Sequence, residues 1–433
     1  MKGYRADLLF SLATRLASIV LRLARNVLLA RLLGPADRGL FALLNSLPDL
    51  IAAATSGGLN TAIGVQAAQQ RCLGLLLSQL LVFGCLLATG ATLVGIVLLR
   101  HFGLELDVVR QLGLTIWLLL LATPLTVLKG GLLTLHNASG GVTAFNSLRL
   151  LESSLPLILL LALWLVWRDQ PLLAALASWL LGLSVVALVG WAWLTRSGAA
   201  RPRWQPGSAR ELLSFSGRSH PDVLFRQLLL RADYLLIASL LGSSAVGQYA
   251  MATAAVELLL IVPEAVTTPL MKRLLQQEQG IETLTPLALR LTATVMLLAC
   301  LVLAALGEIL IRLLFGAAYL PAYPALLALL PGVFALCYAS ILRLDLLGKG
   351  HPGRLSLLLG LATLLNLAVN LVLIPRLGIV GAGLASSLAY LLATLGMLVL
   401  FCRLSHTPWQ RTLLLLPSDL HLLRRLWRER RTG

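Results

Sequence analysis

The sequence predicts an all-α integral membrane protein with about twelve transmembrane helices, arranged as two pseudo-symmetric six-helix bundles around a central cavity. Three observations predict this fold class: the composition, the spacing of the apolar runs, and an internal repeat. Of the 433 residues, 58% are hydrophobic and only 12% are charged, and the mean hydropathy is +0.88. Globular domains carry roughly a quarter of their residues as charged side chains. A lipid bilayer must therefore solvate most of this chain.

The apolar residues fall into runs of about 20, each long enough to cross a hydrocarbon core of roughly 30 Å as a helix. The predicted helices cover residues 8–33, 39–67, 73–99, 112–135, 142–167, 171–195, 222–241, 245–270, 287–315, 321–347, 355–374 and 381–402. The longest interior polar stretch divides them. We therefore expect an N-terminal six-helix lobe (1–195), a cytoplasmic linker (196–221), a C-terminal six-helix lobe (222–402) and a basic amphipathic cytoplasmic tail (403–433).

The charge balance is strongly basic, with 35 Lys and Arg against 18 Asp and Glu, a net charge of +17. Nucleic-acid binding is excluded because too little chain remains outside the predicted helices to build such a module. The basic residues concentrate in the loops on one predicted side, which places both termini in the cytoplasm. The five cysteines lie in or beside apolar runs without zinc-site spacing, so we expect packing residues and no metal site.

The chain contains an internal repeat. Residues 28–42 match residues 236–250 without a gap at an offset of 208, through the pattern A-x-L-L-G-x4-G-x-[FY]-A. The same offset places Asp49 on Glu257. Because each predicted copy has an even number of helices, the two halves should be related by an axis along the membrane normal and enclose a central cavity.

Three segments resemble a known family: LLARLLGPADRGLFA (28–42), DYLLIASLLGSSAVGQYA (233–250) and NLAVNLVLIPRLGIVGAGLA (366–385). They look like the polysaccharide-transporter branch of the MOP superfamily, which contains the Wzx-type flippases of lipid-linked O-antigen and capsule units, with MurJ and the MATE antiporters as more distant relatives. The resemblance implies a V-shaped pair of six-helix lobes and alternating access.

The resemblance also implies a function and a location. The expected substrate is an undecaprenyl-pyrophosphate-linked oligosaccharide for lipopolysaccharide O-antigen, capsule or exopolysaccharide. Its export would use an H⁺ or Na⁺ gradient and no other cofactor. The expected location is the bacterial cytoplasmic (inner) membrane, with membrane lipids and polysaccharide polymerase or assembly proteins as further partners.

A polar stripe runs along the first predicted helix. Ser11, Arg15, Ser18, Arg22 and Arg25 are spaced by three or four residues, so they share one face. Such a stripe cannot face lipid, and guanidinium groups bind phosphate bidentately at any accessible pH. We therefore expect the arginines to line the cavity and bind the pyrophosphate. Alternatively, Arg15 snorkels to the interface and Arg22 pairs with an acid.

The seventh predicted helix offers a second candidate group. Asp222, Arg226 and Asp233 share a face at spacings of four and seven, whereas Arg231 points away from them. Arg226 could complete a phosphate clamp across the two lobes, or it could form an ion pair with Asp222. Asp233 is a candidate for charge pairing or ion coupling.

Other charged residues in the predicted helices are candidates because burying charge in a bilayer is costly. Arg149 and Glu152 are three residues apart and can form either a structural pair or part of the cavity. Lys129 lies near a predicted helix end, where snorkelling is its default role and cavity lining the alternative. Arg343 and Asp345 share that position on a later helix.

Carboxylates beside prolines are the candidates for ion coupling. Asp49 follows Pro48, and Glu257 and Glu264 flank Pro263, where proline removes a backbone hydrogen bond. A buried carboxylate can take up and release a proton as its surroundings change, so Asp49 or Glu257 could couple transport to protons. The alternative is that these acids only neutralise the arginines.

Two further features carry predictions. Thr55–Asn60 (TSGGLN) would break a helix, and we interpret it as a hinge. In the tail, Leu420, Leu423 and Trp427 share one face, opposite a row of arginines that would lie on anionic lipid; the alternative is a solvated tail.

Two other function classes were weighed. A MATE-type cation-coupled antiporter needs a cavity that accepts cations, whereas the predicted helices contain an excess of basic side chains. A membrane-embedded glycan polymerase or ligase needs an active site at a membrane face, and the predicted non-cytoplasmic loops are too short to build one. We therefore expect a flippase and not an enzyme.

Overall fold

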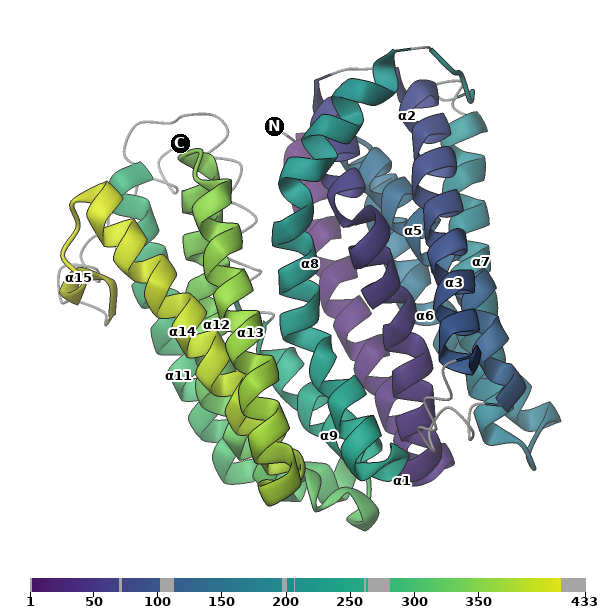
Figure 1. Ribbon diagram of the computed structural model, residues 1–433, viewed down its shortest axis with the longest axis vertical. Coiled ribbons are helices and arrows are strands. Elements are labelled where there is room, and N and C mark those ends of the chain that lie inside the picture. Colours follow the sequence, from purple (N-terminus) through teal and green to yellow (C-terminus); the bar gives the residue numbers. More distant parts are fainter. Residues whose placement is uncertain are drawn as a thin grey trace. The chain divides into compact units, whose positions relative to one another are not determined.

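The computed structural model describes residues 2–69, 72–101, 113–196, 201–205, 207–260, 262–263 and 281–413, and these residues are almost entirely helical (Figure 1). In chain order the elements are α1 (Lys2–Ala68), α2 (Leu73–Gln79), the π-helix η1 (Leu80–Leu86), α3 (Leu87–His101), the 3₁₀-helix η2 (Gly113–Leu118), α5 (Leu119–Ala138), α6 (Val142–Val166), α7 (Pro171–Arg196), α8 (Ser208–Leu241), α9 (Ser243–Glu257), η3 (Leu258–Leu260), α11 (Ile281–Leu314), η4 (Ala317–Tyr319), α12 (Ala322–Gly348), α13 (Pro352–Leu377), α14 (Ile379–Ser405) and α15 (Gln410–Leu413).

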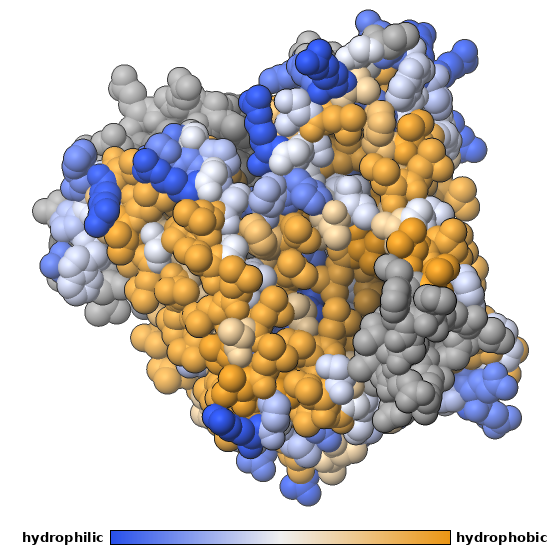
Figure 2. Space-filling model, viewed as in Figure 1, coloured by the Kyte–Doolittle hydropathy of each residue, from blue (hydrophilic) through white to orange (hydrophobic). Residues whose placement is uncertain are grey.

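Within the described ranges, eight helical stretches are long and apolar enough to cross a bilayer, beginning with Leu73–Val97 and ending with Ile379–Ser405. Their outward faces carry large apolar side chains that water would not tolerate. Val166 is 74% exposed and Leu313 is 68% exposed. Figure 2 shows hydrophobic side chains covering the helices, with hydrophilic ones gathered near helix ends. The predicted all-α membrane fold is confirmed.

Contacts divide the chain into two compact units. Unit 1 comprises residues 1–251 with 312–320, and unit 2 comprises residues 252–311 with 321–433. The predicted boundary between lobes at the linker 196–221 stays a prediction. Part of that stretch is helical, however, because α8 begins at Ser208 and packs along α1 in unit 1.

The repeat corresponds to two equivalent breaks in the helices of unit 1. α1 joins the first two predicted helices across a kink at Gly34, which has φ 67° and ψ 173°. α8 ends at Gly242, 208 residues later, with φ 84° and ψ 178°. Positive φ is accessible to glycine at little cost, which explains why both copies of the repeat have glycine at this position.

The second glycine of each copy lies at a close helix crossing. A Cβ at Gly39 would overlap the carbonyl oxygen of Ser243, and a Cβ at Gly247 would overlap the carbonyl oxygen of Pro35. Ser243 and Pro35 are also related by the offset of 208, so the contact is reciprocal. Small residues allow backbones to approach closely in membranes. The repeat motif therefore encodes a pseudo-symmetric crossing of α1 with α9.

The segment at the end of α11 is attached to this crossing through α1. Arg31 donates hydrogen bonds to the carbonyl oxygens of Leu313 and Leu314, the latter at 2.9 Å. The Tyr319 hydroxyl donates to the Ala30 carbonyl oxygen at 3.2 Å. Burial raises the pKa of Tyr319 to about 12, so this hydroxyl stays protonated and remains a donor.

The expected hinge at residues 55–60 is not a break. α1 continues as a helix through these residues, and a Cβ at Gly58 would overlap the carbonyl oxygen of Ser216 on α8. Ser219 also donates a hydrogen bond to the Gly58 carbonyl oxygen at 3.3 Å. Here glycine permits a close contact between α1 and α8, so the hinge interpretation is corrected to a packing site.

In unit 2, α12, α13 and α14 pack through small and uncharged polar residues. Ser387 on α14 donates to the Ala328 carbonyl oxygen at 2.5 Å and accepts from the Gly332 backbone N–H at 3.1 Å. Asn366 on α13 donates to Ser386 Oγ at 3.3 Å, and Asn370 donates to Asn366 at 3.1 Å. We call these contacts the α12–α14 seam.

Two sequence predictions lie outside the described residues. Glu264 belongs to the stretch 264–280, and the amphipathic pattern of the tail falls within 414–433. Both stay predictions.

Candidate functional site

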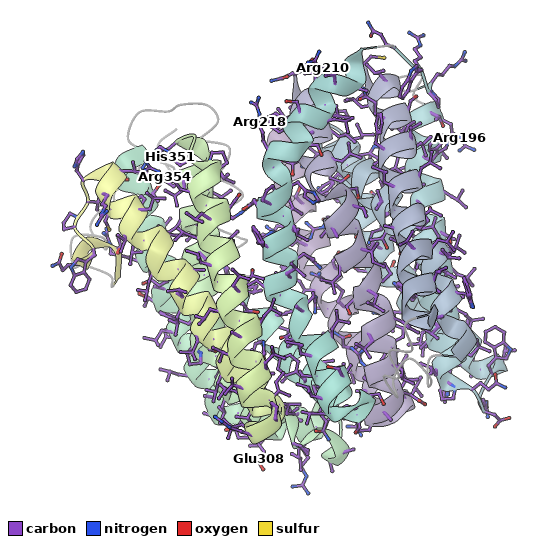
Figure 3. All side chains as sticks on the ribbon, in the orientation of Figure 1. Arg196, Arg210, Arg218, Glu308, His351 and Arg354 are labelled. Atoms are coloured by element: carbon purple, nitrogen blue, oxygen red, sulfur yellow. The ribbon has the colours of Figure 1, made fainter. Side chains whose placement is uncertain are left out.

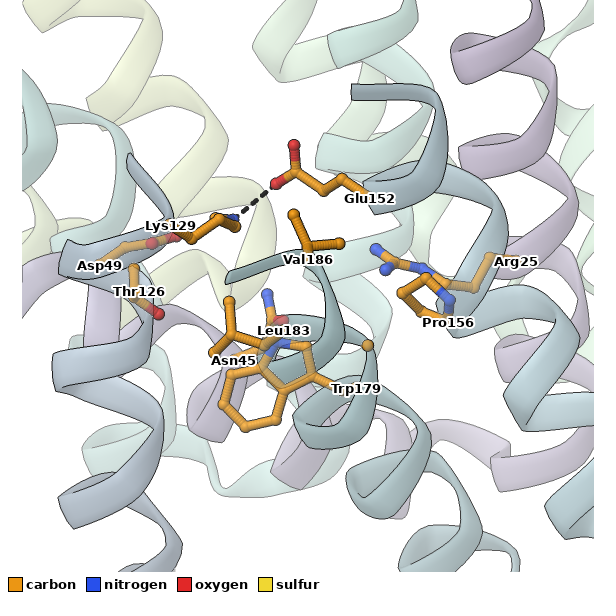
Figure 4. Close-up of a pocket in the computed structure, with 11 residues that line it drawn as sticks. Arg25, Asn45, Asp49, Thr126, Lys129, Glu152, Pro156, Trp179, Leu183 and Val186 are labelled. Atoms are coloured by element: carbon orange, nitrogen blue, oxygen red, sulfur yellow. Dashed lines mark hydrogen bonds and ion pairs between the residues drawn. The ribbon is translucent and has the colours of Figure 1, made fainter. Parts of the chain in front are cut away.

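Unit 1 contains a small polar cavity among α1, α5, α6 and α7 (Figure 4). Its volume is about 180 Å³. Charged and hydrogen-bonding side chains face it from every one of these helices except α7, which contributes Trp179 and aliphatic groups. The lining residues are Arg25, Asn45, Asp49, Thr126, Lys129, Glu152, Pro156, Trp179, Gly182, Leu183 and Val186.

A larger cavity of about 520 Å³ adjoins the first and extends to α8. Asp49, Thr126, Lys129 and Glu152 line both cavities. The remaining polar lining comes from α1 and α8, and it comprises Ser56, Asn60, Thr61, Arg226, Gln227 and Arg231. The two cavities together are called the charged cavity below.

An ion pair between α5 and α6 lies where the two cavities meet. Lys129 Nζ is 2.5 Å from Glu152 Oε1, and the side chains are 21% and 37% exposed. The short turn after α5, with Gly140 at φ 80°, sets the two helices antiparallel, so Lys129 faces Glu152. The expectation that Lys129 snorkels to the interface is therefore wrong. Its ammonium group turns towards a carboxylate inside the protein.

Arg149 lies three residues before Glu152 on α6. Its guanidinium lies over the Phe145 ring, 5.7 Å from the centroid, and the ion pair expected between Arg149 and Glu152 stays a prediction. Arg149 is half-buried and is not among the residues that line the charged cavity.

Asp49 is the acid in the centre of the charged cavity. α1 remains helical through Pro48, although proline supplies no backbone N–H to the helix. Lys129 of α5, Arg231 of α8 and the carboxylate of Glu152 line the same cavity as Asp49. The acid therefore has cations from α5 and α8 nearby.

The arginine stripe of α1 divides into two parts. Arg25 lines the smaller cavity, and its Nε is buried with no hydrogen-bond partner among the described residues. Arg22, three residues before Arg25, is exposed. Towards the start of the helix Arg15 is half-buried, and Ser11 accepts a hydrogen bond of 2.7 Å from Asn146 of α6. The start of the stripe thus contacts α6 through Ser11, and Arg25 is the stripe residue found in the lining of the two described cavities.

On α8, the predicted face differs from the observed one. Arg226 and Arg231 both line the charged cavity. Asp233 instead is 2% exposed and accepts hydrogen bonds from the Tyr249 hydroxyl at 2.6 Å and from the Tyr234 backbone N–H at 2.9 Å. Sequence spacing alone grouped Asp233 with Arg226 and set Arg231 apart, and it missed the tyrosine that binds Asp233.

The remaining predicted candidates lie outside the charged cavity. Glu257 is exposed at the end of α9 and belongs to unit 2. Asp345 on α12 forms an ion pair of 2.7 Å with Lys349 and accepts a hydrogen bond of 3.2 Å from Thr285. Arg343 lines neither of the two cavities.

The charged cavity therefore presents four basic side chains, Arg25, Lys129, Arg226 and Arg231, and two carboxylates, Asp49 and Glu152. Such a surface attracts an anion, because the bases outnumber the acids and low polarity strengthens charge interactions. The amides and hydroxyls around it can hydrogen-bond to sugar-like groups. Sequence reasoning did not select Asn45 or Trp179, since single polar or aromatic residues in apolar helices carry no periodic signal, whereas Asn60 belongs to the segment 55–60 that it did single out.

Comparison with known proteins identifies relatives of this chain. A sequence model described as "Polysaccharide biosynthesis protein" matches residues 28–324. Comparison with curated proteins found no match.

Solved structures of transporters share the fold. The lipid II flippase MurJ, in an inward closed conformation, has a TM-score of 0.72 at 16% identity, over 94% of this chain and 89% of that chain. An inward-facing multidrug resistance MATE family transporter of the MOP superfamily has a TM-score of 0.64 at 15% identity, over 91% of this chain and 96% of that one. A MOP superfamily transporter from Pyrococcus furiosus, described as having a binding pocket of reverse polarity, has a TM-score of 0.55 at 16% identity, over 92% and 93% of the two chains.

The chain belongs to the polysaccharide biosynthesis protein family and has the fold of the MOP superfamily, as the sequence resemblance predicts. Family and fold together indicate a multi-pass membrane transporter.

Proposed function

We propose that this member of the polysaccharide biosynthesis protein family flips a polyprenyl-pyrophosphate-linked oligosaccharide across the bacterial cytoplasmic membrane by alternating access. The oligosaccharide would be an O-antigen, capsule or exopolysaccharide unit on an undecaprenyl carrier. Family membership supports a role in polysaccharide assembly, and a structural relative is named as a flippase of a lipid.

The observation that carries the proposal is the charged cavity. A pyrophosphate is an anion with several acceptor oxygens, and Arg25, Arg226 and Arg231 can each donate to it. Charged side chains inside a membrane protein are costly and mark substrate or ion pathways. Asn45, Asn60 and Thr126 would then contact the first sugar through hydrogen bonds.

The Lys129–Glu152 ion pair can exchange partners with the substrate. The Lys129 ammonium is neutralised by Glu152 at 2.5 Å. An incoming phosphate would compete with Glu152 for this ammonium. The exchange lets the protein avoid an unpaired buried cation both before and after substrate binding.

Asp49 is the proposed coupling residue. It lines both parts of the charged cavity, so its ionisation changes the net charge that the substrate meets. Protonation of Asp49 would strengthen anion binding, and loss of the proton would weaken it. The charge state of Asp49 would therefore link substrate affinity to H⁺ binding, and Na⁺ bound at the same carboxylate would have the same effect on charge. No other cofactor is proposed.

The proposed orientation places both termini in the cytoplasm, since the basic residues of the loops concentrate on that side. A flipped glycolipid would then be delivered to polymerase and assembly proteins on the opposite side.

A cation antiporter is the second candidate, because MATE transporters share the fold and Asp49 and Glu152 could bind a cation. The four basic side chains in the same cavity disfavour it, since they repel cations.

Deleting the gene in its native host and weighing lipid-linked oligosaccharides by mass spectrometry tests the proposal. A complete undecaprenyl-linked unit should accumulate, with loss of the surface polymer. Lys129→Met should fail to complement, whereas Arg168→Gln, in the exposed turn between α6 and α7, should complement fully. Unchanged lipid pools with new sensitivity to cationic compounds would contradict the flippase and favour the antiporter.

A further inference from the structure

Unit 2 carries an apolar groove between α13 and α14 that is separate from the charged cavity. Its volume is about 470 Å³. Aliphatic side chains form almost all of the lining, and an arginine from each helix completes it. The lining residues are Arg354, Leu357, Leu358, Leu361, Leu392, Leu395, Gly396, Val399, Leu400 and Arg403.

Gly396 of α14 and Leu358 of α13 meet in the lining of the groove. The Leu358 side chain occupies the space that a Cβ at Gly396 would need, so the two helices pack closely there. Its walls stay uncovered by protein: Leu357 is 63% exposed, Leu395 56% and Val399 52%. The groove is thus an open channel on the lipid-facing surface.

The two arginines lie at one end of this channel. Arg354 is in the first turn of α13 and Arg403 is in the last turn of α14, and the two helices are joined at Gly378, so these turns lie at the same end of the pair. Figure 3 labels Arg354 at that end of α13. Both side chains are exposed, and within the described part of the chain neither forms a hydrogen bond or ion pair.

Lys349, a base near these two arginines, differs from them because it has partners within the protein. Lys349 is held by Asp345 at 2.7 Å and by Ser405 Oγ at 2.6 Å, and its ammonium lies 5.0 Å from the centre of the Phe401 ring. The fold therefore neutralises one base at this end of unit 2 and leaves two others facing the groove.

The length of the groove matches one leaflet. Arg403 follows Leu392 by eleven helical steps, which at 1.5 Å each extend about 16 Å. This is about half of a hydrocarbon core of roughly 30 Å. Trp409, 55% exposed, follows α14 beyond the arginines, as is typical of the membrane interface.

We propose that this groove binds an anionic membrane phospholipid, with an acyl chain along its leucines and the phosphate between Arg354 and Arg403. Charge selects this occupant. The basic tail of the chain, with Arg424, Arg425, Arg428 and Arg431, would be repelled by the two arginines, and so would the same face of a second copy. An acyl chain fills an apolar channel, and the two non-bridging oxygens of an anionic phosphate diester can accept hydrogen bonds from both guanidinium groups.

Native mass spectrometry of the purified, delipidated full-length protein tests this site. The probes are phosphatidylglycerol and phosphatidylcholine with identical acyl chains. We expect a phosphatidylglycerol adduct that the double variant Arg354→Gln/Arg403→Gln binds roughly 30-fold more weakly, since each basic residue near an anionic headgroup contributes about a factor of five.

Two further variants keep the test specific. Val399→Trp should also lose the adduct, because it fills the groove without changing the charge. The charge-matched control Arg168→Gln/Arg376→Gln removes two exposed arginines outside the groove and should bind like the wild type. Equal binding of the two lipids to wild type, or an adduct that survives in both groove variants, would overturn the site. A concentration-dependent dimer that vanishes in Val399→Trp would assign the groove to a second copy instead.

This proposal does not depend on the transported substrate. The groove variants retain the charged cavity, so failure of the flippase proposal leaves the lipid-binding result unaffected, and the reverse also holds.

Discussion

The charged cavity of unit 1 and the α12–α14 seam of unit 2 both place polar groups inside apolar helices, but they do so differently. In the seam, each donor meets a nearby acceptor: Ser387 bridges α12 and α14 at 2.5 and 3.1 Å, and the amides of Asn366 and Asn370 are completely buried. In the cavity, basic side chains outnumber acids and surround empty space. The seam pairs most of its polar groups internally, as is expected of a structural contact, although the buried Asn370 Oδ1 has no hydrogen-bond partner among the described residues. The cavity instead gathers four bases and two carboxylates in its lining, and this excess of positive charge favours the binding of an anion.

Disrupting the packing of the α12–α14 seam should have the largest effect, which is on the yield of folded protein. Gly332→Leu places a side chain against Ser387 Cα, and overpacking a core typically costs about 1–3 kcal/mol. Because the obstacle is backbone, we expect most of the protein to be lost from the monodisperse peak in size-exclusion chromatography. Gly90→Leu is the control, since nothing lies within 4 Å of a Cβ there. A normal yield of Gly332→Leu would show that the seam is not closely packed.

Removing the charge of Lys129 should stop transport while leaving the fold intact. Lys129→Met deletes a charged hydrogen bond, so affinity for the lipid-linked substrate should fall roughly 10- to 100-fold. The partly exposed pair should contribute only about 1 kcal/mol to stability. Substrate binding and thermal unfolding of the purified variant measure both effects.

Lys349→Met is the matched control, because Lys349 also pairs with a carboxylate, at 2.7 Å, but outside the charged cavity. It should lower stability and spare transport. Equal transport by the two variants would remove the distinction between cavity and structural charges.

Asp49→Asn sharpens the comparison by testing what the acid adds. The variant should bind substrate at least as well as wild type, because one negative charge leaves the cavity. Flipping in proteoliposomes should, however, lose its response to an imposed pH gradient. If the response persists, the coupling group lies elsewhere, with Glu152 as the next residue to test.

The smallest effect is expected from Asn366→Leu in the seam. An interhelical hydrogen bond in a membrane protein contributes about 0.6 kcal/mol on average, so the unfolding temperature should fall only slightly. Transport should remain normal. A transport defect in a stably folded Asn366→Leu protein would indicate that the seam moves during the cycle.

Periodicity and glycine spacing predicted the fold well. The predicted helix 142–167 is observed as Val142–Val166, and 171–195 as Pro171–Arg196, because helix ends in a membrane protein are set by the length of apolar runs. The glycine pair of the repeat, Gly34 and Gly242, is likewise predictable from local sequence, because the positive φ at these positions favours glycine in both copies. The hinge predicted at residues 55–60 was wrong because glycine pairs in a helix signal close packing as readily as bending.

The candidate site was only partly predictable. Arg25 and Arg226 were chosen as bases on predicted polar faces, and both line the charged cavity. Arg231 is predicted to point away from the polar face, and Lys129 to line the cavity only as the alternative to snorkelling, because helical arithmetic treats one helix at a time. The partner of a charge 23 residues away, as in Lys129 and Glu152, depends on how two helices rotate against each other.

The sequence by itself determined the membrane environment, the approximate helices, the repeat and the family, because composition, apolar length and glycine position are properties of the chain. Only the tertiary structure decided which charges are neutralised and which are available. Tyr249 binds Asp233 at 2.6 Å and Glu152 binds Lys129, whereas the buried Nε of Arg25 has no partner in the described structure. Pairing depends on distances between helices, which no periodicity along one helix contains.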